Sequence, residues 1–287
     1  MRFSEAYRRL RESLSSVCGD FSDYEARRIL ENLTGCDAQG FAQRLTRPQP
    51  LEPDVIERME EILSRRTARE PLEYILGEAW FCGLRLRVTP DCLIPQADTE
   101  VVCERARALL PRGGRLADVG TGSGCIALSV LAGTEGTSAA AYDNSAPALS
   151  VAEENAVSLG LQTRFFPVLA DVFSENFMAG DGVFDVIVSN PPYIRTKDIA
   201  GLAPEVRAEP FAALDGGADG LRFYRRLLAV CPAHLASGGA MVLEIGYDEG
   251  PALRSLCDSM GLSCEIFRDF GGNDRGCVIT AVPEKKR

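Results

Sequence analysis

The chain has 287 residues, of which 46% are hydrophobic and 25% are charged. At roughly 150 residues per domain, this length predicts about two domains. The composition excludes a disordered chain, a collagen-like repeat and a disulfide-rich miniprotein. The formal net charge of -10 disfavours nucleic acid as a direct partner, because binding along a phosphate backbone depends on clustered cations.

Two further features concern location and metal binding. No apolar run approaches the roughly 18 residues of a membrane span, and residues 1–5 lack the apolar stretch of a signal peptide. We therefore expect a cytoplasmic protein with no membrane partner. The 10 cysteines form no Cys-x-x-Cys pair, and His234 is the only histidine, so we expect reduced cysteines and no metal site.

The first part of the chain is predicted to be helical. Apolar residues recur at helical spacing, as in Phe3, Tyr7, Leu10 and Leu14. Residues 1–75 are therefore predicted to form a small helical bundle.

Residues 76–100 are predicted to be a linker with a short β-hairpin, because apolar residues alternate over 80–89. After it, short apolar strands alternate with helical stretches, so residues 101–287 are predicted to form an α/β domain with a Rossmann-like, mainly parallel sheet. The connection 270–276 is too short for a crossover helix, so the last two strands should form an antiparallel hairpin. The seven predicted strands are Leu116–Val119, Ser138–Tyr142, Arg164–Leu169, Phe184–Ser189, Ala240–Ile245, Glu265–Phe270 and Cys277–Val282.

The longest irregular stretch, 194–220, follows the fourth predicted strand. Ligands of such sheets bind outside the carboxyl ends of the strands. A loop this long in a compact domain is more often functional than idle, so we expect it to border a site.

A glycine-rich loop, DVGTGSG at 118–124, joins the first strand of the sheet to a helix that begins near Cys125. Glycine suits a tight turn that lets backbone amides approach a ligand. The loop departs from the dinucleotide fingerprint, because Cys125 stands where the third glycine would be. Taken alone, it is also consistent with a turn that serves only strand-to-helix packing.

Two aspartates follow the next two strands. Asp143 lies about 20 residues after Gly120, the offset at which an acid meets a ribose hydroxyl pair. The alternative is that Asp143, Asn144 or Ser145 caps the following helix. Asp171 ends the third strand, where it could recognise an adenine amino group or could be a simple turn aspartate.

The most specific signal is SNPPY at 189–193, at the end of the fourth strand. Two successive prolines remove two backbone donors and stiffen the turn. The Asn190 side-chain oxygen and the Pro191 carbonyl could then accept hydrogen bonds from both hydrogens of an NH2 group, and Tyr193 could stack on a planar amide or base. The alternative is a turn that only terminates the strand.

This pattern resembles a known family. Asn-Pro-Pro-Tyr marks methyltransferases that use S-adenosylmethionine on planar amino or amide nitrogens, and the flanking segments resemble the bacterial release factor glutamine methyltransferases. The resemblance covers nearly the whole chain. Its segments are EPLEYILG at 70–77, LIP at 93–95, GTGSGCIAL at 120–128, 184–194, EPFAALDGG at 209–217 and EIG at 244–246.

The resemblance implies an activity, a fold and a set of site residues. It implies a seven-stranded class I methyltransferase domain that methylates the glutamine amide in the Gly-Gly-Gln motif of peptide chain release factors, leaving S-adenosylhomocysteine. The helical domain and the loop around 209–220 would help to recognise the release factor. Independently of the resemblance, we expect Glu244 to serve packing or to support the site residues from behind. The implied catalytic residues are Asn190, Pro191, Pro192 and Tyr193, and the implied cofactor residues are Gly120, Thr121, Gly122, Ser123, Gly124, Asp143, Asp171, Val172 and Asn190.

The sequence also departs from the family pattern. Gln96 and Ala97 replace an arginine and a proline, and Val172 stands where some members have an aromatic residue. The segment 78–84 also resembles the sister enzymes that methylate a glutamine of a ribosomal protein, so that target stays open. Two hypotheses from different classes remain: a nucleic-acid adenine methyltransferase, which the net charge disfavours, and a noncatalytic cofactor-binding scaffold.

Overall fold

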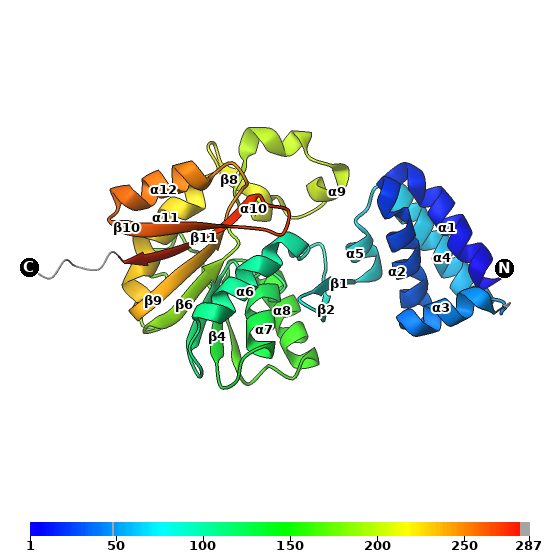
Figure 1. Cartoon of the computed structure of the whole chain (residues 1–287), viewed down its shortest axis with the longest axis horizontal. Coiled ribbons are helices and arrows are strands. Elements are labelled where there is room, and N and C mark those ends of the chain that lie inside the picture. The colour runs from blue at the N-terminus through cyan, green and yellow to red at the C-terminus, as the bar shows by residue number, and fades with distance from the viewer. Residues whose placement is uncertain (48, 282–287) are drawn as a thin grey trace, which may run out of the picture. The chain divides into compact units, whose positions relative to one another are not determined.

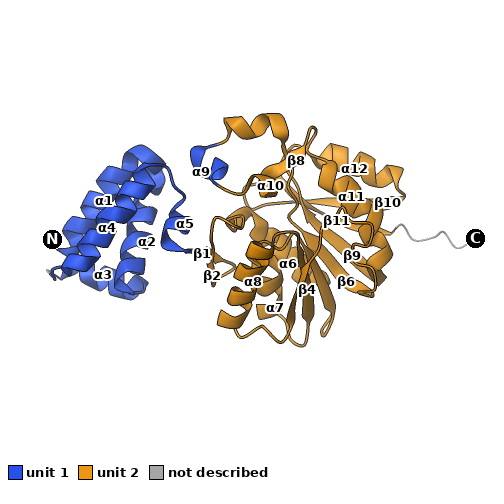
Figure 2. Ribbon diagram, turned by 180° about the vertical axis from the view of Figure 1, so that it is seen from behind, with its two compact units in different colours: residues 1–78, 203–208 blue, residues 79–202, 209–287 orange. Residues whose placement is uncertain are grey.

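A computed structural model describes residues 1–47 and 49–281 (Figure 1). The chain divides into two compact units, which Figure 2 colours separately. Unit 1 comprises Met1–Glu78 with the short segment Ala203–Ala208, and unit 2 comprises the rest. The predicted end of the last strand, Val282, lies outside the described residues.

Unit 1 is a bundle of helices with an apolar interior. Its predicted helical spacing is confirmed, because Phe3, Leu10 and Leu14 are buried in its core. Helix α3 (Ala38–Thr46) begins after Asp37, whose Oδ1 accepts a hydrogen bond from Gly40 N (2.8 Å) and caps it. The helices are α1 (Phe3–Cys18), η1 (Gly19–Phe21), α2 (Ser22–Thr34), α3 (Ala38–Thr46), α4 (Pro53–Thr67), α5 (Leu72–Leu76) and α9 (Pro204–Arg207).

Charged side chains hold α9 within unit 1. Arg66 of α4 is buried, and its guanidinium donates to both Glu25 of α2 and Glu205 of α9. Arg69 Nη2 donates to the other oxygen of Glu205, Oε2 (2.8 Å). These bonds explain why a segment so late in the chain belongs to the helical unit.

Unit 2 contains a seven-stranded sheet in the order β10-β11-β9-β6-β3-β4-β5. Strands β9, β6, β3, β4 and β5 are parallel, whereas β11 runs antiparallel to both β9 and β10. The predicted parallel sheet with a terminal antiparallel hairpin is confirmed. The strands are β3 (Arg115–Val119), β4 (Ser138–Asp143), β5 (Phe165–Leu169), β6 (Phe184–Ser189), β9 (Leu235–Glu244), β10 (Leu262–Arg268) and β11 (Asp274–Ala281).

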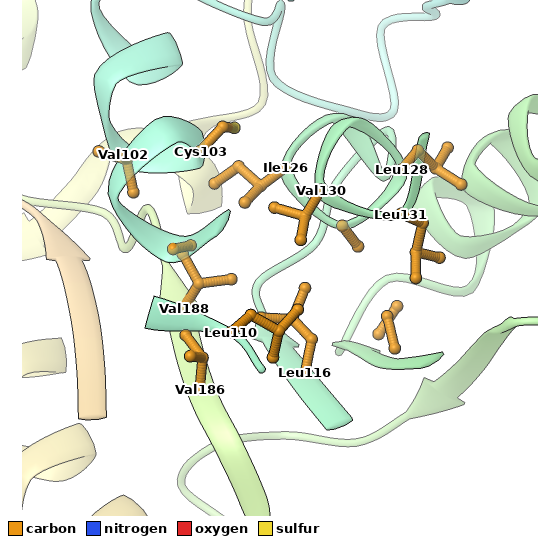
Figure 3. Close-up of a cluster of buried hydrophobic side chains, with 14 of the residues drawn as sticks. Val102, Cys103, Leu110, Leu116, Ile126, Leu128, Val130, Leu131, Val186 and Val188 are labelled. Carbon is orange, nitrogen blue, oxygen red and sulfur yellow. The ribbon is translucent and has the colours of Figure 1, made fainter. Parts of the chain in front are cut away.

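The central strand β6 is buried on both faces, which explains its run of apolar residues. Along β6, Val186 and Val188 pack into one core cluster, whereas Ile187 packs into the other. The first cluster includes α6 (Glu100–Leu109), α7 (Cys125–Ala132) and α8 (Ala146–Ser158); the second includes α11 (Arg222–Val230) and α12 (Gly250–Ser259). Figure 3 shows Val102, Cys103, Ile126 and Val130 from α6 and α7 facing Leu116, Val186 and Val188 of the sheet.

Short elements complete unit 2. Strands β1 (Glu78–Phe81) and β2 (Leu84–Arg87) form a two-stranded sheet. Cys82 and Gly83 join them and both have positive φ, as a two-residue type I′ turn requires. The stretch 194–220 was predicted to be irregular, but most of it is ordered into short elements. Besides α9, the elements of this stretch are β7 (Ile194–Arg195), η3 (Thr196–Gly201), α10 (Phe211–Leu214) and β8 (Asp215–Gly217). Two short helices lie outside it, η2 (Ala97–Thr99) and η4 (Cys231–His234).

Candidate active site

A cavity of about 220 Å³ lies in unit 2 at the carboxyl ends of the parallel strands. The ends of β3, β4, β5 and β6 all contribute to its lining, as expected for a doubly wound sheet. Its other wall comes from 91–93, from α10 with the preceding Pro210, and from α11. The site residues predicted from the sequence that line it are Gly120, Gly122, Asp143, Val172, Asn190, Pro191 and Pro192.

The glycine loop has two separate tasks. Gly120 (φ 74°) and Gly122 (φ 55°) line the cavity, and a Cβ at either position would meet nothing within 4 Å. Glycine is therefore required at these two positions because of their positive φ. Gly124 also has positive φ, but its Cβ would lie 3.0 Å from Leu128 Cδ1 and 3.2 Å from Ala152 Cβ. Gly124 thus allows close packing as well, and its predicted cofactor contact stays a prediction.

The remaining loop residues, Thr121 and Ser123, are buried and do not line the cavity. Thr121 Oγ1 donates to Asp118 Oδ2 (2.7 Å), and Ser123 O accepts from Asn155 Nδ2 (2.9 Å). Asp118 itself is fully buried, and the loss of solvent raises its pKa to about 7. These residues hold the loop from behind.

Asp143 lines the cavity and also fixes the loop. Its Oδ2 accepts from Gly122 N (2.8 Å), and its Oδ1 accepts from Ser145 N (2.9 Å). The helix cap is Ser145, whose Oγ accepts from Ala148 N (3.2 Å). A carboxylate oxygen has two lone pairs, so each oxygen of Asp143 can accept one more hydrogen bond from a ligand.

The two residues predicted on the adenine side are placed differently. Asp171 is exposed and does not line the cavity, and its Oδ1 accepts from Phe173 N (2.9 Å), which is a turn contact. Val172 is buried and does line it. Its carbonyl accepts from Arg226 Nε (2.7 Å), which anchors this part of the wall.

Asn190 begins the turn after β6, and its side-chain amide is oriented. Asn190 Nδ2 donates to Thr99 Oγ1 (3.3 Å), so its Oδ1 is the end available to a ligand. Pro191 and Pro192 continue the cavity wall. Tyr193 does not line it: its ring packs against the second core cluster, and its Oη donates to Glu244 Oε1 (3.4 Å).

Tyr193 is closely enclosed by the stretch that follows it. A Cβ at Gly216 would lie 2.6 Å from Tyr193 Cα, and a Cβ at Gly220 would lie 2.6 Å from Tyr193 O. Neither position tolerates a side chain. The glycines of this stretch therefore hold the turn, while the stacking role predicted for Tyr193 stays a prediction.

The sequence did not predict several contacts at this site. Thr99 meets Asn190 across a separation of 91 residues, and no local pattern signals such a contact. Glu209 Oε2 accepts from Ile94 N (2.9 Å), which joins two segments that border the cavity. Gln96 Nε2 donates to Ile94 O (3.1 Å), and neither Gln96 nor Ala97 lines the cavity.

Within the described residues, no group of three or more histidines, cysteines or acids could hold a metal ion. No described helix is long and apolar enough to cross a membrane. The 10 cysteines are all free thiols.

Comparison with known proteins identifies the class. Residues 99–217 match the family described as methyltransferase small domain, and residues 5–77 match the family described as PrmC N-terminal domain. A solved methyltransferase from Pyrococcus furiosus shares the fold with a TM-score of 0.51 at 18% identity, over 79% of this chain and 99% of that one. The fold and the sequence match together define a methyltransferase.

Two curated relatives narrow this class. A release factor glutamine methyltransferase of Cereibacter sphaeroides is 40% identical over 277 residues, which cover 96% of this chain and 97% of that protein. A protein of the same name from Geobacter sulfurreducens is 38% identical over 250 residues, covering 86% and 85%. The chain belongs to the release factor glutamine methyltransferase family. The resemblance stated from the sequence is confirmed.

Proposed function

We propose that this enzyme transfers a methyl group from S-adenosylmethionine to the side-chain amide nitrogen of the glutamine in the Gly-Gly-Gln motif of peptide chain release factors. The observation that carries the proposal is the pair of oxygens at the start of the Asn-Pro-Pro-Tyr turn. We call Asn190 Oδ1 and the Pro191 carbonyl the amide-binding corner. Both residues line the same cavity as Gly120, Gly122 and Asp143.

The cavity fits S-adenosylmethionine in several respects. Gly120 and Gly122 have no side chains, and the space around their missing Cβ atoms is open, so a ligand can approach the backbone. The free lone pairs of Asp143 suit the two hydroxyls of a ribose. Val172, Phe223 and Leu227 supply apolar wall. When bound, the cofactor supplies an electrophilic methyl group and leaves as S-adenosylhomocysteine.

The task of the chain is to bind and orient the glutamine amide. An amide nitrogen is a poor nucleophile, because its lone pair is delocalised into the carbonyl. Accepting hydrogen bonds from both N–H groups at the amide-binding corner helps to localise that pair and aims the nitrogen. Correct alignment can contribute up to roughly 7–11 kcal/mol. No strong base is required before transfer, because the surplus proton can leave afterwards.

The release factor is proposed as the substrate from the names of the curated relatives. The Gly-Gly-Gln tip would enter the cavity beside Asn190, with Tyr193 held at the end of the turn. The helical unit and the stretch 209–220 are proposed to recognise the body of the release factor, and we expect the enzyme to act in the cytoplasm. No role for nucleic acid is required, which agrees with the net charge of -10.

The test is labelled-methyl transfer to purified release factors that carry either glutamine or alanine at the tip. We expect labelling of the glutamine form only. Ribosomal proteins serve as a parallel acceptor, and duplex DNA and RNA as a third. Labelling of the alanine form, or of another acceptor in place of the release factor, would overturn the proposal.

A further inference from the structure

Glu244 ends β9, beside the strand that leads into the amide-binding corner. Ser189 of β6 pairs with Leu243 of β9, so the next residues of these parallel strands, Asn190 and Glu244, come to the same edge of the sheet. Glu244 is only 2% exposed. Its main-chain oxygen accepts a hydrogen bond from Tyr224 Oη (2.9 Å). The sheet thus places a buried carboxyl group next to the turn.

This carboxyl group is related to both ends of the turn, through Tyr193 by a hydrogen bond and through Thr99 by proximity. Tyr193 Oη donates to Glu244 Oε1 (3.4 Å), and the Thr99 hydroxyl lies close enough to the same carboxyl group to lower its pKa. Asn190 Nδ2 in turn donates to Thr99 Oγ1 (3.3 Å). Tyr193 is therefore bonded to the carboxyl group, and Asn190 is bonded to a hydroxyl beside it, at opposite ends of the turn.

The direction of these bonds determines which end of the Asn190 amide faces the cavity. An ionised carboxylate only accepts hydrogen bonds, and a threonine hydroxyl has one proton to donate. If Thr99 donates to Glu244, it can only accept from Asn190. The NH2 end of Asn190 must then face Thr99, and Oδ1 faces the ligand.

We propose that Glu244 and Thr99 are positioning residues of this site, which orient Asn190 through the Thr99 hydroxyl and hold Tyr193 through its own hydroxyl. The inference rests on the proposed function, because it assigns to these residues the alignment of the amide-binding corner. Neither residue lines the cavity. They act on the substrate only through Asn190 and Tyr193.

A purely structural role does not explain a carboxyl group at this position. Glu244 Oε2 is buried and has no hydrogen-bond partner among the described residues. Burial raises the pKa of Glu244 to about 7, against the opposing effects of Thr99, Arg275 and Tyr193. A buried polar atom without a partner costs free energy that an apolar side chain would avoid. The carboxyl group therefore costs stability, and an acceptor role at the site gives a reason for its presence.

The experiment compares Thr99→Val with Thr99→Ser and with the matched control Thr137→Val. Thr137 is also buried in unit 2, at 1% exposure, and does not line the cavity. We expect Thr99→Val to lower kcat for the release factor by about 10- to 100-fold, since small misplacements of this kind can cost about 10²-fold. The Kd of S-adenosylmethionine should change less than about twofold. Thr99→Ser keeps the hydroxyl and should restore most of kcat.

The variant Glu244→Gln tests the role of the carboxylate through the pH dependence of kcat, which a packing role alone would not change. The ionised carboxylate is the better acceptor, so kcat of the wild type should rise as the pH passes through about 7, and the Gln variant should lose this rise. The ionisable groups that act on Glu244 are Asp98, Tyr193, Arg275 and Cys125, and all of them remain in the variant. An unchanged pH profile would contradict the inference.

The outcomes separate this inference from the proposed function. If the wild type does not methylate the release factor, the proposed function fails and the positioning role fails with it. If the wild type is active and Thr99→Val keeps wild-type kcat, only the positioning role is wrong. Equal losses of kcat in Thr99→Val and Thr137→Val, with equal losses of stability, would reduce Thr99 to a packing residue.

Discussion

Asp143 and Asn190 line the same cavity, but their hydrogen bonds indicate different tasks. Asp143 holds Gly122 N and Ser145 N and keeps further lone pairs for a ligand. Asn190 is oriented by Thr99 and belongs to the amide-binding corner. One residue should therefore affect cofactor binding, and the other should affect transfer.

We predict that Asp143→Ala weakens S-adenosylmethionine binding by about 10- to 100-fold, because it removes charge-assisted hydrogen bonds. Asn190→Ala should change that affinity only a few-fold. It should lower kcat by about 10²- to 10³-fold, the usual effect of removing one preorganised polar group from an active site. Calorimetric titration and labelled-methyl transfer measure the two effects. Wild-type transfer by Asn190→Ala would remove Asn190 from the mechanism.

Asp118 gives a prediction for stability. Burial raises its pKa from 3.8 to about 7, so the folded state binds more protons than the unfolded state between these values. Asp118 therefore makes its full contribution to the free energy of unfolding below about pH 4. This contribution is lost as the pH rises to about 7. The two pKa values differ by an amount worth roughly 4 kcal/mol.

Asp118→Asn should remove this loss, so the free energy of unfolding should fall less between pH 4 and pH 8 in the variant than in the wild type. Denaturant unfolding of both proteins across this range measures the difference. Because all other titrating groups are shared, subtraction isolates Asp118. Parallel curves for the two proteins would show that its pKa is not raised.

At the scale of elements, the turn after β6 depends on β8. Gly216 of β8 packs directly on Tyr193, so β8 fixes the end of the turn that carries Asn190. The sequence predicted a functional stretch at 194–220 but not its short elements. Such elements have weak patterns of their own and form because neighbouring segments hold them.

We predict that Gly216→Ala lowers both kcat and the free energy of unfolding. The free energy of unfolding should fall by about 1–3 kcal/mol, which is typical when an extra methyl group is forced into a well-packed region. The new Cβ would lie 2.6 Å from Tyr193 Cα, so the turn must move. Gly201→Ala is the matched control from the same stretch, because a Cβ there meets nothing within 4 Å and its φ is not positive. The control should leave both quantities close to wild type, and equal effects of the two variants would contradict the prediction.

At the scale of the whole molecule, the chain divides into two units whose boundary is not simply sequential. After Leu202 the chain contributes Ala203–Ala208 to the helical unit and then returns to the sheet unit. Glu205 is the anchor of this segment, through Arg66 and Arg69. The Arg66 side chain is 6% exposed and that of Glu205 is 20% exposed.

Glu205→Ala should lower the free energy of unfolding of the helical unit by about 1–3 kcal/mol, because it leaves buried Arg66 with one partner fewer. Amide hydrogen exchange across 203–208 should become faster. Glu135→Ala is the control: its pair with Arg112 has both side chains 84% exposed, and such surface pairs contribute about 0–1 kcal/mol. Unchanged exchange in Glu205→Ala would show that other contacts hold the segment.

The sequence alone determined the helical spacing of the first unit, the strands of the sheet and the glycine, Asp143 and Asn-Pro-Pro-Tyr motifs, because each depends on neighbouring residues. The tertiary structure decided the rest. It showed that Gly124 allows close packing, that Asp171 makes a turn contact, and that Thr99 bonds Asn190 while Glu244 bonds Tyr193. Strand order and register bring such distant residues together, and no local pattern encodes either of them.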